Sequence, residues 1–269
     1  MPNASLPLKA AIVLLALFLV ACGARRADFT ETASVEELYA SAKQSMDRGN
    51  MGRAVQHYRR LIARFPFGEY TEQAQIELAY SQYKLRQPDD ALSTINRFIR
   101  TYPTHEKIVY AYYLRGLINF DREFSFLERF IGRDPTHRDL THMRQAFTDF
   151  NELIQRYPDS IYAADARQRM IYLRNNLAQS EIHVAAYYLK RRAWVAAATR
   201  ARFVVENYPQ APQNGDALAV LAFSYGRLGE EKLASDAERI LRMNFPDHPY
   251  LSGGWPHEKS VWRRLLLFG

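Results

Sequence analysis

AVQHYRRLIARFP, residues 54–66, is an amphipathic segment that starts at a small residue and ends in an aromatic-proline pair. Its apolar side chains recur every three or four residues, which predicts a helix with one buried face. Because proline lacks the N–H that a further turn needs, we expect this helix to end near Phe65. The same frame recurs four more times, as ALSTINRFIRTYP (91–103), AFTDFNELIQRYP (146–158), AATRARFVVENYP (197–209) and ASDAERILRMNFP (234–246).

A second small residue precedes the first alanine of four frames by twelve positions. These residues are Ala42, Ala79, Ala185 and Ala222, and Gly116 takes this place in the third frame if an insertion follows it. Small residues let two antiparallel helices approach closely, so we expect the alanine of each frame at a helix–helix contact. The pattern resembles the tetratricopeptide (TPR) repeat, a helix–turn–helix of about 34 residues. The predicted fold is therefore an all-α solenoid of five TPR repeats forming a superhelix, with a non-TPR helical bundle as the alternative.

The distances between the five prolines predict the domain organisation. Two of the four intervals are 37 residues, but the third repeat is 55 residues long and the fourth is 51. The excess of the third repeat falls between its helices, around Asp121 to His142, and the fourth repeat contains one long helix from Tyr162 to Arg191. We expect repeats one to three in 34–161 and repeats four and five in 162–250. Residues 251–269, with apolar side chains in Trp255–Phe268, are expected to cap the array or to dock on a partner.

The N-terminus predicts secretion and lipid attachment. Lys9 precedes an unbroken apolar run, residues 10–21, which is the length of a signal peptide core. The run ends in Leu19-Val20-Ala21-Cys22, which resembles the lipobox of bacterial lipoproteins. We expect residues 1–21 to be removed, Cys22 to carry a diacylglyceryl group and an N-acyl chain, and residues 22–33 to form a tether. The alternative is an ordinary signal peptide with an incidental cysteine.

Composition excludes several classes of chemistry. Cys22 is the only cysteine, so no disulfide, cysteine zinc site or thiol nucleophile is available within one chain. The sequence has no Gly-rich phosphate loop, no Gly-x-Ser-x-Gly and no His-Glu-x-x-His, so we expect neither an enzyme nor a cofactor besides the covalent lipid. Residues 134–142 contain two histidines and two aspartates, but they are interpreted as a polar loop and not as a metal site.

Charge points to acidic or anionic partners. Without Lys9 the chain has 35 basic against 29 acidic side chains, a net charge of +6. The arginines are spread over many helices and no run of five like charges occurs, so nucleic acid is not expected as a partner.

Tyrosines fall where the first helices of a TPR array line the concave groove. Counted from the alanine positions, the first three repeats place five tyrosines and two lysines there: Tyr39, Tyr80, Tyr83, Tyr110, Tyr113, Lys43 and Lys84. Tyrosine offers a large rigid contact area and a hydroxyl for a peptide backbone, so these residues are candidates for substrate binding. Packing in the core is the alternative.

A more specific resemblance comes from Arg133-Asp134-Pro135 and from residues 186–197, AYYLKRRAWVAA. Together with the lipobox and an enlarged third repeat, they resemble the BamD family of lipoproteins of the β-barrel assembly (BAM) machinery in Gram-negative outer membranes. The resemblance implies a scaffold anchored at the periplasmic face of the outer membrane. It also implies that N-terminal repeats contact unfolded outer-membrane protein precursors. C-terminal repeats would contact the periplasmic domains of the barrel protein BamA, alongside other assembly lipoproteins.

The same resemblance places an arginine that faces the partner at Arg200. Lys190, Arg191, Arg192 and Trp194 are further candidates for this contact. Arginine presents a planar fork to carboxylates, which suits an acidic partner surface. For residues 190–192 the alternative is that cations near a helix C-terminus only stabilise the helix dipole. Two other functions stay open: a TPR lipoprotein of pilus or secretin assembly, and a peptidoglycan-associated cell-wall factor.

Replacing Cys22 by alanine should abolish lipid attachment and leave the precursor incorrectly processed. Gly23 follows the cysteine, where aspartate would favour retention in the inner membrane, so the wild type should fractionate with outer membranes. Metabolic labelling with a radioactive fatty acid and membrane fractionation measure both effects. Normal labelling and fractionation of Cys22→Ala would contradict the predicted anchor.

Overall fold

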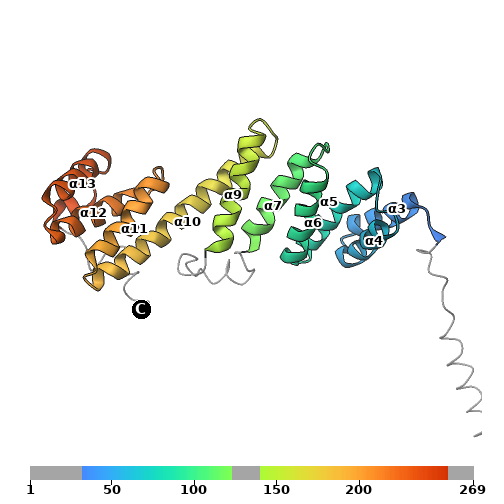
Figure 1. The fold of residues 1–269 in the computed structure, drawn as a ribbon, viewed down its shortest axis with the longest axis horizontal. Coiled ribbons are helices and arrows are strands. Elements are labelled where there is room, and N and C mark those ends of the chain that lie inside the picture. The colour runs from blue at the N-terminus through green and yellow to red at the C-terminus, as the bar shows by residue number, and fades with distance from the viewer. Residues whose placement is uncertain (1–31, 123–139, 254–269) are drawn as a thin grey trace, which may run out of the picture. The chain divides into compact units, whose positions relative to one another are not determined.

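The computed structural model describes residues 32–122 and 140–253, and this part of the chain is helical without a strand (Figure 1). It divides into two compact units, one up to Gln87 and one from Pro88 onward. The first unit contains α3 (Val35–Asp47), α4 (Met51–Arg64) and α5 (Glu69–Lys84). The second unit contains α6 (Pro88–Thr101), α7 (Ile108–Arg122), α9 (Thr141–Arg156), α10 (Ala163–Lys190), α11 (Trp194–Asn207), α12 (Asn214–Leu228), α13 (Glu231–Asn244) and the short 3-10 helix η2 (Pro249–Ser252).

The aromatic-proline pairs end the helices as predicted. In each of the five frames the helix ends one residue before the aromatic residue. The aromatic N–H still donates to the carbonyl four residues earlier, as in Phe65 to Leu61 and Tyr157 to Leu153, both at 2.8 Å. Proline then supplies no further N–H, so the chain leaves the helix. The predicted helical repeat fold is confirmed.

Close helix approach is clearest in the third repeat, where α7 packs on α9. A Cβ atom built on Gly116 would lie 2.6 Å from Cε1 of Phe150, closer than real Cβ atoms approach their neighbours. Phe150 is fully buried, and so is the frame alanine Ala146. Glycine therefore fits this position because the ring of Phe150 occupies the space of a side chain.

Four repeats also share a turn that the frame did not predict. Five residues before the frame alanine, the backbone has a positive φ: Gly49 (77°), Arg86 (59°), Arg192 (59°) and Gly229 (80°). This left-handed conformation costs about 1–2 kcal/mol for a residue with a Cβ. Glycine satisfies it in the first and last repeats, whereas arginine occupies it in the second and fourth.

The frame alanines differ in how deeply they are buried. Ala54, Ala91, Ala146 and Ala197 are fully buried. Ala234 is only half-buried, and the buried side chains of α13 are instead Ala237 and Leu241. Helix α13 packs on α12, and the partly buried Tyr250 and Leu251 of η2 pack against the cluster that contains Leu241.

Two features of the repeat lengths are confirmed. The extra residues of the third repeat lie between α7, which ends at Arg122, and α9, which begins at Thr141. The long helix of the fourth repeat is α10, with 28 residues, and it packs against both α9 and α11. The predicted grouping of repeats into 34–161 and 162–250 stays a prediction.

Several expectations lie outside the described residues. They concern the signal peptide and Cys22, the segment Arg133-Asp134-Pro135, most of the polar loop 134–142, and Trp255–Phe268. Among the helices that the structure does describe, none is long and apolar enough to span a membrane.

Candidate functional site

In the first unit, a buried carboxylate binds the predicted Tyr39 together with Tyr58, which the sequence did not indicate. Glu77 of α5 accepts hydrogen bonds from the hydroxyl groups of Tyr58 (2.6 Å) and Tyr39 (3.1 Å). The amide of Gln73 donates to it at 2.9 Å, and Nζ of Lys43 lies 3.7 Å away. A buried carboxylate is tolerated only when such donors replace its water, so this cluster joins α3, α4 and α5 into one polar core.

The same cluster shifts the titration of both tyrosines. Burial, together with the negative charge of Glu77, raises the pKa of Tyr58 and of Tyr39 well above the ordinary tyrosine value. Both hydroxyl groups therefore stay protonated and act as donors. Tyr58 is fully buried, whereas Tyr39 is half-buried, with its ring 5.3 Å from that of the exposed Tyr70.

The remaining predicted groove residues of this unit lie near the end of α5. Tyr80 and Tyr83 are half-buried, with ring centroids 6.4 Å apart. Nζ of the exposed Lys84 lies 5.8 Å from the centroid of the Tyr80 ring. The hydroxyl of Tyr80 has no hydrogen-bond partner among the described residues, so it can serve an external acceptor or donor.

In the second unit, the predicted tyrosines of α7 gather around Tyr162. The ring of Tyr113 stacks on that of Tyr162 with centroids 4.7 Å apart, and Tyr110 lies 5.7 Å from the same ring. The Tyr113 hydroxyl donates to Asp165 at 2.7 Å. Burial and this carboxylate raise the pKa of Tyr113 to about 12. All five predicted tyrosines are half-buried, and their role in substrate binding stays a prediction.

Arg200 of α11 belongs to a network that the sequence did not reveal. Its Nη1 lies 3.1 Å from Oε2 of Glu181 in α10, and Nη2 of Arg144 in α9 lies 3.5 Å from the other carboxylate oxygen. The Glu181 side chain is 7% exposed, whereas those of Arg144 and Arg200 are 55% and 46% exposed. One buried negative charge thus holds two half-exposed positive charges, which leaves a net positive charge at the surface.

The other predicted partner residues form the turn between α10 and α11. Lys190 ends α10, and the guanidinium of the exposed Arg191 lies 4.6 Å from the centroid of the Tyr187 ring. Arg192 adopts the left-handed conformation described above, and the Trp194 ring lies 5.7 Å from that of Phe223. Arg200 lies six residues beyond Trp194, about 9 Å along the helix, so it is separate from this turn.

Sequence reasoning missed the buried carboxylates, which also include Asp149 of α9. Asn119 donates to Asp149 at 2.7 Å, Gln145 donates at 3.0 Å, and Nε of Arg115 forms an ion pair with it at 3.0 Å. Burial raises the pKa of Asp149. The available signal was an acidic residue among apolar neighbours, as in Glu77 between Ile76 and Leu78. Among the described residues no group of three or more His, Cys, Asp or Glu is placed to hold a metal ion.

These features define a helical-repeat protein whose described surface carries half-buried tyrosines and paired arginines. The chain belongs to the YfiO family of outer membrane lipoproteins, which matches residues 31–240. It is 46% identical to outer membrane protein assembly factor BamD of Xylella fastidiosa strain 9a5c over 270 residues, 99% of this chain and 92% of that protein. It is 40% identical to BamD of Neisseria meningitidis serogroup A, covering 94% of this chain and 96% of the relative. The BamD of Haemophilus influenzae is 32% identical, with coverage of 87% and 89%.

Replacing Glu77 by alanine should destabilise the fold by about 1–3 kcal/mol, because it leaves the buried Tyr58 hydroxyl without its carboxylate acceptor. Urea unfolding of the full chain, followed by circular dichroism, measures the change. Glu77→Gln is the matched control, because its amide oxygen can still accept one of the two tyrosine hydrogen bonds, and it should lose less stability. Equal stability of wild type and Glu77→Ala would contradict a structural role for this carboxylate.

Proposed function

We propose that this protein is a lipid-anchored assembly factor for outer membrane proteins, with its helical repeats in the periplasm. The observation that carries the proposal is the match along nearly the whole chain to relatives named outer membrane protein assembly factor BamD. The membership in an outer membrane lipoprotein family and the lipobox that ends at Cys22 support the anchor. In this proposal the protein acts as a scaffold and performs no chemistry of its own.

The partner in the membrane is proposed to be a BamA-like barrel protein, whose periplasmic domains bind the fourth repeat near Arg200. Arginine has five N–H donors, and only one nitrogen of Arg200, Nη1, donates to Glu181. The other donors of this half-exposed side chain are held in a fixed orientation by α10 and suit an acidic surface. Other assembly lipoproteins would join the same complex.

Unfolded outer-membrane protein precursors are proposed as the substrate, with the tyrosines of the first three repeats as candidate contact residues. The arrangement favours Tyr80 over Tyr39 as a contact residue, because the Tyr39 hydroxyl already donates to Glu77. Of the candidate lysines, Lys43 pairs with Asp47 and Glu77, whereas Lys84 carries its charge beside the ring of Tyr80. Aromatic rings that are partly fixed by their neighbours lose little entropy when a peptide binds.

Arg200→Ala should reduce copurification of the BamA-like barrel protein by about tenfold, because a desolvated charge pair at an interface is strongly favourable. Alanine is preferable to glutamate here, because a second carboxylate beside Glu181 would itself disturb the fold. Glu181 keeps Arg144 at 3.5 Å but loses its closer partner, so some loss of stability is expected, and the melting temperature is measured to confirm that the variant is folded under the assay conditions. The measurement is quantitative recovery of the barrel protein from detergent-solubilised outer membranes.

Arg191→Ala is the matched control, because the Arg191 side chain is exposed and, within the described part of the chain, it contacts the face of the Tyr187 ring. Its recovery of the barrel protein should stay within about twofold of wild type. Full recovery with Arg200→Ala would remove Arg200 from the proposed interface, and an equal loss with both variants would contradict its larger contribution relative to Arg191.

A further inference from the structure

A groove lies between α9 and α10, away from the tyrosines and from Arg200. It has a volume of about 360 Å³, and nine residues line it. Phe147, Asn151 and Ile154 recur along one face of α9, and Arg167, Met170, Ile171 and Arg174 recur along one face of α10. These spacings of three and four residues place both rows along the groove, which is therefore about 10 Å long.

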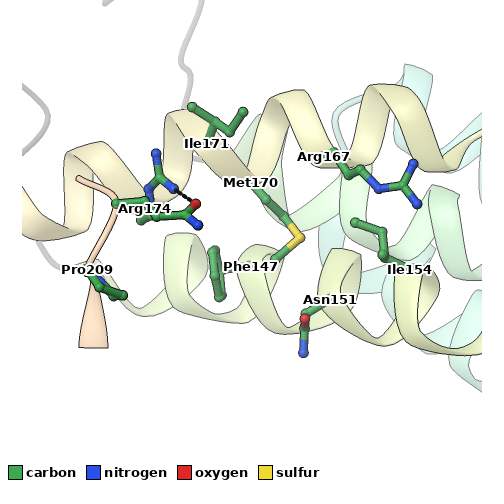
Figure 2. A pocket seen from close by; sticks show the side chains of 9 residues that line it. Phe147, Asn151, Ile154, Arg167, Met170, Ile171, Arg174 and Pro209 are labelled. Atoms are coloured by element: carbon green, nitrogen blue, oxygen red, sulfur yellow. Dashed lines mark hydrogen bonds between the residues drawn. The ribbon is translucent and has the colours of Figure 1, made fainter. Parts of the chain in front are cut away.

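The floor of the groove is apolar and accessible. Figure 2 shows Met170 pointing between the two helices, with Phe147 below it and Ile154 beyond. These three side chains are half-buried, and Ile171 at the edge is 44% exposed. An apolar surface of this kind gains free energy when another apolar side chain covers it. Methionine adapts its shape to different side chains, which suits a docking site.

The two ends of the groove are positively charged. Arg167 and Arg174 lie on either side of Met170 (Figure 2). Arg167 donates to the carbonyl of Pro158 at 2.8 Å, and Arg174 donates to the amide oxygens of Gln210 (2.9 Å) and Asn175 (3.2 Å). All these acceptors are neutral, and neither arginine pairs with a carboxylate in the described parts of the chain. None of the nine lining residues is acidic.

We propose that this groove binds a short acidic segment of a protein partner, with one bulky apolar side chain over Met170 and a carboxylate at each arginine. The volume accommodates one or two large side chains, and the length matches about three residues of extended chain. Charge complementarity selects the acidic segment, because both arginines can exchange a neutral acceptor for a carboxylate. The site goes beyond the proposed function, since neither the candidate tyrosines nor Arg200 line it.

The test measures binding of fluorescein-labelled hexapeptides to the full chain in detergent by fluorescence anisotropy. The probe is Glu-Glu-Leu-Phe-Glu-Glu, compared with one peptide that has lysine for each glutamate and one that has serine for leucine and phenylalanine. The acidic apolar probe should bind at least about tenfold more tightly than either, because binding needs both the charge and the apolar contact. Equal binding of the three peptides, or no binding of the probe, would overturn the proposal.

Two variants locate the site. Arg167→Glu combined with Arg174→Glu should weaken binding of the probe by about tenfold or more, and Met170→Asp should weaken it by a similar factor. The matched control is Arg97→Glu with Arg100→Glu, which makes the same change of charge at exposed positions of α6 outside the groove. Circular dichroism melting confirms that each variant is folded. Undiminished binding in both groove variants would place the peptide elsewhere and contradict the proposal.

A last experiment with phosphatidylglycerol vesicles tests whether the groove binds lipid headgroups and not an acidic protein segment. If the groove binds an acidic protein segment, association with these vesicles should be the same for Met170→Asp and wild type. A loss of vesicle binding in that variant, together with no preference for the acidic apolar peptide, would identify the groove as a lipid contact and overturn the proposal.

Discussion

The structure depends on how closely neighbouring helices can approach. In a two-helix repeat with no disulfide, stability comes from packing, and packing improves when a side chain on one helix fills the space left by a small residue on the other. The contact between Gly116 and Phe150 shows this constraint most directly, since even one methyl group on the glycine would overlap the ring. The buried alanines of the first four frames meet the same requirement with one carbon atom.

The close packing also determines where polar groups must go. Glu77, Asp149 and Glu181 each come from a helix that is pressed between neighbours, and each is stabilised by donors from other helices. Their partners are held in place as a result: Tyr39 in the first unit, and Arg144 and Arg200 in the second. Arg200, which is proposed to meet the partner, is therefore oriented by a buried residue. A buried carboxylate thus influences the protein surface, because it holds a partly exposed side chain in one orientation.

The parts of the fold that could be predicted from the sequence are those that a residue determines in its own segment of the chain. Proline ends a helix through its own missing N–H, so the ends at Phe65 and Tyr157 followed from the sequence alone. The frame did not distinguish the half-buried Ala234 from the four fully buried alanines, because burial also depends on residues that are distant in the sequence. The left-handed turn at Arg86 was also missed, because arginine gives no hint of a positive φ.

The candidate site was harder to predict for the same reason. Helical spacing identified half-buried tyrosines such as Tyr80 and Tyr113, but it could not separate a groove from a core. It gave no sign that Arg200 lies against Glu181, because those residues come from different helices and meet only when α10 and α11 pack. The groove beside Met170 likewise exists only as a product of two packed helices.

The most direct test of the packing constraint is the free energy of unfolding of Gly116→Ala and Gly226→Ala, measured by urea denaturation of the full chain. Both replacements add one methyl group within a helix. Beside Gly226 no atom lies within 4 Å of the new Cβ, so alanine should stabilise the fold by up to about 1 kcal/mol through helix propensity. At Gly116 the methyl group would collide with Phe150 and should destabilise the fold by about 1–3 kcal/mol. Stabilisation by both replacements would contradict the claim that close helix approach governs this fold.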